Sequence, residues 1–119
     1  MPPGADEGSI LMNIKEDLRM ECEEGILRCR LVGEIDHHTA KHVREKIDAE
    51  IFKSRPSGVI LDFQEVRFMD SSGRGLIIGR AELCGELRIG VRLVGLSNTA
   101  RKLVTLSGID KLPNLTVSK

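Results

Sequence analysis

Apolar and polar residues alternate near the start of the chain, and this pattern predicts two antiparallel strands. Between Ile14 and Cys22 apolar residues fall mostly on every second position, which is the period of a strand with one buried face. Glu23-Glu24-Gly25 follows and favours a tight hairpin turn, because glycine adopts positive φ without strain. A second alternating segment, Ile26 to Val32, completes the hairpin, and Gly33 is expected to end it.

Farther along, segments with helical spacing of apolar residues alternate with short apolar runs. The predicted helices run from Thr39, as the cap, to Phe52, from Ser71 or Ser72 to about Leu87, and from Ser97 or Asn98 to Gly108. The predicted strands are Val59 to Leu61, which should be buried on both faces, Val91 to Leu96, and an edge strand from Leu115 to Val117. Strands that alternate with helices imply right-handed crossovers. We therefore expect an α/β domain with a mostly parallel sheet covered by helices.

The beginning of the chain differs from the rest. Residues 1–8 are acidic and rich in proline and glycine, unlike the basic and apolar segments of a signal peptide. We expect residues 1–11 to be a disordered tail and residues 12–119 to be one domain. The longest apolar runs fall far short of the roughly 18 residues of a membrane span. The three cysteines have no CxxC spacing, which favours a reducing, cytoplasmic setting.

Charge and aromatic content argue against a nucleic-acid partner. The chain has 18 basic and 18 acidic residues, and its aromatic residues are three Phe with no Trp or Tyr. Phosphate binding needs an excess of Lys and Arg, and base stacking needs a set of aromatic side chains.

The most unusual segment, Phe68 to Gly75 (FMDSSGRG), has a carboxylate, two hydroxyls and two glycines where a helix begins. Helix capping explains one of these residues or two. The segment could also cradle a phosphate, but it matches neither GxGxxG nor a Walker A loop. Alternatively, a serine here is itself the phosphate acceptor, since a phosphoserine is favourable at a helix N-terminus.

A second candidate segment, Gly33 to Thr39 (GEIDHHT), lies close to His42 and holds the other two histidines. His38 and His42 could share a metal on one helical face, but neither an HExxH pattern nor a third ligand accompanies them. We expect no metal and no cofactor. A serine hydrolase using Ser71 is a further alternative, although the chain lacks a GxSxG elbow.

Together these two segments, with Leu106-Ser107-Gly108, resemble the anti-sigma factor antagonists of the STAS-domain family, and most closely the sporulation branch that antagonises the anti-sigma-F factor. The resemblance covers roughly residues 12 to 119. It implies a small mixed, mostly parallel sheet with about three to four helices packed against it. It also implies a regulator without catalytic residues, which binds an anti-sigma factor that is a serine kinase. That kinase uses ATP to phosphorylate the antagonist, and a serine phosphatase reverses the modification; neither nucleic acid nor membrane is a direct partner.

In this family the phosphorylated residue is the first serine after the aspartate, which corresponds to Ser71. Arg74 stands where close relatives often have an apolar or different residue, so the resemblance assigns it no role. A polar loop that merely caps the helix at Thr39 remains an alternative for the upstream segment. The resemblance predicts a partner-binding surface formed by Asp36, His37, His38, Asp70, Ser72 and Gly73.

Other functions predict different observations. An antagonist in a general stress-response sigma pathway would share the fold and differ in its partner. A small serine hydrolase or a nucleotide-binding protein would turn over model esters or retain nucleotide. The STAS module of an anion transporter would follow a membrane region, which this sequence does not show.

Overall fold

The computed structural model describes residues 17–118, which form one mixed sheet of five strands in the order β2-β3-β4-β5-β6. Strands β2 and β3 pair antiparallel, and the other neighbours pair in parallel. The expected tail, residues 1–11, and the start of the predicted first strand lie outside the described residues. In chain order the elements are β2 (Leu18–Glu23), β3 (Ile26–Ile35), α2 (His37–Ser54), β4 (Gly58–Met69), α3 (Ser71–Glu86), β5 (Gly90–Val94), α4 (Asn98–Leu106), a 3-10 turn (Ile109–Lys111) and β6 (Leu115–Val117).

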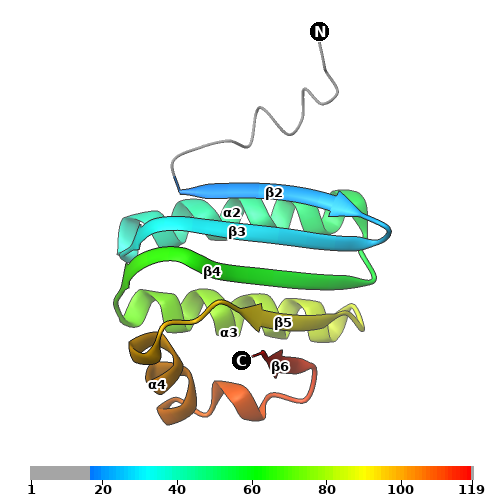
Figure 1. The fold of residues 1–119 in the computed structure, drawn as a ribbon. Helices are drawn as coiled ribbons and strands as arrows, with labels where there is room; N and C mark the ends of the chain where they lie inside the picture. The colour runs from blue at the N-terminus through cyan, green and yellow to red at the C-terminus, as the bar shows by residue number, and fades with distance from the viewer. Residues whose placement is uncertain (1–16, 119) are drawn as a thin grey trace, which may run out of the picture.

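Helices cover one face of the sheet. Figure 1 shows α2 and α3 side by side behind the sheet, with α4 near the β5 and β6 edge. Apolar residues of the strands point toward these helices, and α2 contributes a stripe at helical spacing to the same core. Burying each of the larger apolar side chains stabilises the fold by about 1.5 to 3 kcal/mol. The buried stripe of α2 consists of Ala40, Val43, Ile47 and Ile51.

The hairpin has the predicted turn. Glu24 and Gly25 form its two-residue loop with φ of 54° and 84°, and Glu23 pairs with Ile26 across it. Positive φ at both loop positions is typical of a type I′ turn, whose twist matches that of the flanking strands.

The central strands are longer than predicted. Gly33 does not end β3, because the strand continues to Ile35 with φ of 88° at Gly33 and register shifts on both sides of it. β4 extends to Met69, eight residues beyond the predicted end at Leu61. The prediction that Val59 to Leu61 is buried on both faces is also wrong: Ile60 points to the face opposite the helices and is only half-buried. β5 ends at Val94 rather than at Leu96.

Three helix starts have capping side chains. α3 and α4 begin where predicted, with Asp70 and Ser97 as their caps. α2 begins earlier than predicted: Asp36, and not Thr39, is the cap, since its Oδ1 accepts a hydrogen bond from the Thr39 N–H at 2.9 Å.

An ion pair joins the two large helices. The Arg80 guanidinium on α3 lies 2.7 Å (Nε) from Oδ1 of Asp48 on α2, and a second N–H donates to Oδ2 at 3.1 Å. Burial raises the pKa of Asp48 and lowers that of Arg80, while their mutual attraction opposes both changes. The pair helps to hold α2 and α3 in one relative position. It thereby contributes to the spacing between the N-termini of the two helices. None of the helices within residues 17–118 is long and apolar enough to cross a membrane.

Candidate functional site at the start of helix α3

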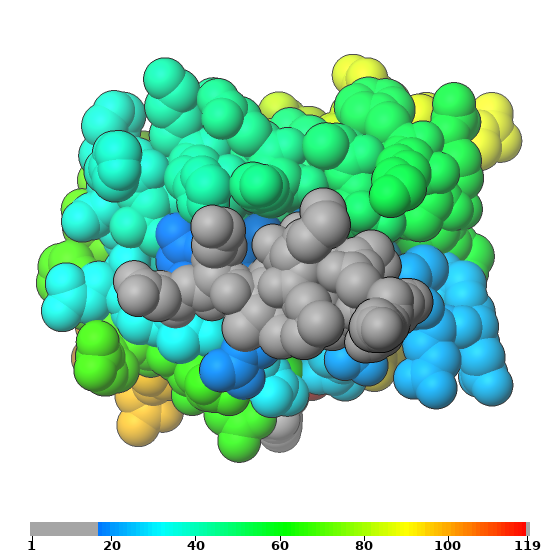
Figure 2. Space-filling model, turned by 90° about the horizontal axis from the view of Figure 1, so that it is seen from above, coloured from blue at the N-terminus to red at the C-terminus, as the bar shows by residue number. Residues whose placement is uncertain are grey.

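The two segments that stand out in the sequence meet at one edge of the sheet. The last residues of β3 and β4 pair side by side, Glu34 with Phe68 and Ile35 with Met69. The Asp70 N–H then donates to the Ile35 carbonyl at 3.2 Å, so the starts of α2 and α3 are neighbours. The two loops therefore lie together, while a role of their residues in binding a partner stays a prediction. Figure 2 shows α2 along one side of the molecule and the β2–β3 hairpin, in blue, at one end; the site lies at the opposite ends of β3 and β4 from this hairpin.

Asp70 organises the first turn of α3. Its Oδ1 accepts the Ser72 N–H at 2.7 Å, and its backbone carbonyl accepts the Gly73 N–H at 3.0 Å. Ser71 is the first residue of the helix and is exposed, whereas Ser72 is half-buried. The capping bonds thus leave Ser71 as the hydroxyl presented to solvent.

Gly73 is buried, which changes the interpretation of this glycine. A Cβ at this position would overlap the side chain of Met69, the last residue of β4. The need for glycine therefore comes from packing within the chain. A direct contact between Gly73 and a partner stays a prediction.

The neighbouring loop presents Asp36, His37 and His38, and all three are exposed. The pKa of Asp36 lies below its ordinary value, chiefly because its carboxylate accepts the hydrogen bond from the Thr39 N–H. His42 lies one turn farther along and approaches Asp17, with 3.9 Å between Nε2 and Oδ1. Within residues 17–118 His, Cys, Asp and Glu side chains do not form a group of three that could hold a metal ion.

The structure has a cleft at the end of β4 that no sequence pattern indicates. It has a volume of about 330 Å³ and lies between the end of β4 and the start of α4. Phe68, which precedes Ser71 by three residues, is 53% exposed at this cleft. Its neighbours along the wall are Val66, Arg67, Met69, Ser97 and Thr99. An exposed aromatic side chain at a cleft is typical of a docking surface.

The described part of the chain matches a known protein family. Residues 17–118 match the model of the STAS domain. The chain belongs to the STAS domain family. The STAS fold predicted from the sequence is confirmed, as a mixed five-stranded sheet with three α-helices within the described residues.

Relatives of this STAS domain are anti-sigma factor antagonists. It is 34% identical over 101 residues to the anti-sigma F factor antagonist of Paenibacillus polymyxa, covering 85% of each chain. It is also 32% identical to SpoIIAA in its unphosphorylated form, with a TM-score of 0.72 over 86% of this chain and 88% of that one. Its likeness to SpoIIAA of Bacillus in the phosphorylated form has the same identity and a TM-score of 0.69, over 86% and 91% of the two chains.

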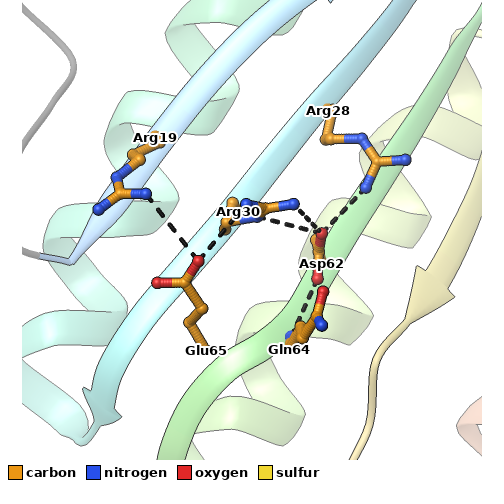
Figure 3. Close-up of polar contacts among 6 residues, drawn as sticks. All are labelled: Arg19, Arg28, Arg30, Asp62, Gln64 and Glu65. Carbon is orange, nitrogen blue, oxygen red and sulfur yellow. Dashed lines mark hydrogen bonds and ion pairs between the residues drawn. The ribbon is translucent and has the colours of Figure 1, made fainter.

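On the open face of the STAS sheet, a charged cluster supports the strand that leads to Ser71. Asp62 on β4 is only 2% exposed, and its Oδ2 accepts hydrogen bonds from Arg28 at 2.9 Å and from Arg30 at 3.1 and 3.2 Å (Figure 3). Its Oδ1 accepts the Gln64 N–H at 2.9 Å. The register between β3 and β4 shifts just beyond this point. Asp62 therefore stabilises the sheet next to the register shift between β3 and β4, beyond which β4 continues toward the site.

Proposed function

We propose that the chain is an anti-sigma factor antagonist whose binding is switched by phosphorylation of Ser71. In the unphosphorylated form it binds an anti-sigma factor with serine kinase activity and so releases a sigma factor. Phosphorylation ends the complex, and a serine phosphatase restores the binding form. The names of the relatives support the class of function, and relatives of this class are regulatory binding proteins rather than enzymes. We place the protein in the cytoplasm, which its three free cysteines favour.

One observation supports Ser71 above other residues. It is an exposed hydroxyl at the first position of α3, held there by the Asp70 cap and flanked by the exposed loop of Asp36. The kinase would transfer the γ-phosphoryl group of ATP to Oγ of Ser71, which loses its proton, and ADP would leave. The chain needs no catalytic group for this step, because it serves as the substrate.

The docking surface would combine polar and apolar parts. Asp36, His37 and His38 form its polar side, and Ser72 and Asp70 shape the loop that presents Ser71. Gly73 contributes by letting Met69 pack beneath the helix start. The exposed ring of Phe68 adds an apolar anchor on the other side.

The charge of a phosphate is enough to switch such a surface. Phosphorylation adds about 1.5 to 2 negative charges at neutral pH. An unpaired charge buried in an interface costs several kcal/mol. A loss of roughly 3 to 4 kcal/mol weakens a complex by two to three orders of magnitude. No large conformational change is required.

The test is a pull-down of the anti-sigma factor with and without ATP, followed by intact mass and phosphopeptide mapping. We expect ATP to add one phosphate at Ser71 and to release the partner. Ser71→Ala should bind but stay bound when ATP is added, and Ser71→Asp should bind weakly. Ser72→Ala, the control for the position of the phosphate, should still gain one phosphate and be released when ATP is added. Phosphate on Ser72, or release of the Ser71→Ala chain by ATP, would show the assignment to be wrong.

A further inference from the structure

Arg74 lies in the same first turns of α3 as Ser71. It is exposed and follows Ser71 by three residues on α3. Side chains three residues apart lie on the same face of a helix, with about 5 to 6 Å between their Cβ atoms. Within residues 17–118 the ion pairs of the structure do not involve Arg74. A Cβ on the next residue, Gly75, would meet nothing within 4 Å, so the surface around Arg74 is open.

The backbone at the start of α3 is already engaged. The Ser72 N–H donates to the Asp70 carboxylate and the Gly73 N–H to the Asp70 carbonyl. A phosphoryl group on Ser71 would thus find these two donors occupied. Side chains are then an important further source of its stabilisation.

The charges on the surrounding elements make a counter-ion necessary. Asp70 at the start of α3 and Asp36 at the start of α2 are carboxylates, and Glu34 is the next-to-last residue of β3. A phosphate adds negative charge to this acidic edge. The basic or titratable residues within the first two positions of α2, the last three of β4 and the first four of α3 are His37 and His38, Arg67, and Arg74. Of these, Arg74 is the one placed a single turn from Ser71 on the same helix.

We propose that Arg74 is the internal counter-ion of phosphorylated Ser71, holding the phosphoryl oxygens through its guanidinium N–H groups. This inference rests on the proposed function, which supplies the phosphate. A guanidinium presents paired donors that match phosphate geometry, and a lysine presents only a point charge. Phosphorylation would then change the docking surface in two ways: it adds a dianion and engages an exposed cation. The modified first turn of α3 stays folded.

The experiment uses the full chain with phosphoserine incorporated at position 71 during translation, so that neither kinase nor partner is needed. The second phosphate ionisation, near pH 6 in a free phosphoserine, is followed by ³¹P NMR. We expect the pKa of the native phosphoserine to lie about 0.5 to 1 unit below that in Arg74→Gln, since an opposite charge within reach favours the dianion and solvent screens it. Arg74→Lys should lie between the two. High salt should shrink the difference.

Arg92→Gln is the matched control, because Arg92 is exposed on β5 and alternates with the buried residues Val91 and Leu93, so it lies on the face of the sheet opposite the helices. It should leave the titration unchanged. Equal pKa values in the native and Arg74→Gln chains would overturn the inference, as would an equal shift in Arg92→Gln. Should the titration behave as expected while phosphorylation leaves partner binding unchanged, the proposed function alone would fail.

Discussion

At the scale of single residues, the exposure of Ser71 is a consequence of what Asp70 does. The Asp70 carboxylate accepts the Ser72 N–H and its carbonyl accepts the Gly73 N–H, so the helix starts with Ser71 exposed. An N-cap of this kind contributes about 1 kcal/mol to stability. Because capping residues have a local sequence signature, this part of the site could be predicted. The exposed Phe68 beside it could not, since its direction depends on the irregular pairing of β4.

Phe68 provides a prediction at this scale. Phe68→Ser should weaken binding of the anti-sigma factor by about tenfold or more, as loss of an aromatic anchor does, and leave stability nearly unchanged. The dissociation constant from calorimetry and the midpoint of urea unfolding would measure the two effects.

The chain offers a matched control for this change. Phe52 is exposed to the same extent, 52% against 53%, and lies near the end of α2, away from its start beside Ser71. Phe52→Ser should leave binding unaltered. Equal weakening by both changes would remove Phe68 from the docking surface.

At the scale of elements, the start of helix α3 packs closely against the end of strand β4 because Gly73 has no side chain. Gly73→Ala should lower the free energy of unfolding by about 1 to 2 kcal/mol, because the new methyl group overlaps Met69 and overpacking outweighs the gain in helix propensity. Gly75→Ala, two residues on, should raise it by about 0.5 to 1 kcal/mol, since its Cβ meets open space. Urea unfolding of both variants would test this, and stabilisation by Gly73→Ala would contradict the packing described.

The pairing of β3 with β4 depends on Asp62. Asp62→Asn should cost about 1 to 3 kcal/mol, because it removes the charge that two arginines share in a buried position. Glu65→Gln, on the same strand, should cost less than about 1 kcal/mol, since its ion pairs with Arg19 and Arg30 are exposed. Chemical denaturation of the two variants is the measurement. A larger loss in Glu65→Gln than in Asp62→Asn would refute this role.

The same cluster shows why the sequence did not reveal every element. Arg28 and Arg30 reach Asp62 across 34 and 32 residues of chain, and no local pattern indicates such a pairing. Alternation located the regular part of β3, and a short apolar run located the start of β4. These patterns failed beyond Gly33 and Leu61, where register shifts interrupt the period of two and the residues become polar.

At the scale of the whole molecule, the sheet brings two distant segments to one end. The parallel pairing of β3 with β4 places both helix starts at the carboxyl edge, and the ion pair of Asp48 with Arg80 keeps α2 and α3 together behind it. The element order predicted a mostly parallel sheet, and the carboxyl ends of neighbouring parallel strands meet at one edge. With 18 charges of each sign, the protein has little overall field, so the charge of one phosphate dominates locally.

The most direct test of this account is the dissociation constant of the anti-sigma factor for two forms of the chain, with serine and with phosphoserine at position 71. Calorimetry in the presence of ADP would prevent phosphoryl transfer during the titration. The account predicts that the phosphorylated form binds at least about 100-fold more weakly, the result of roughly 3 kcal/mol lost at the interface. Dissociation constants within about threefold of each other, a difference below 1 kcal/mol, would contradict it.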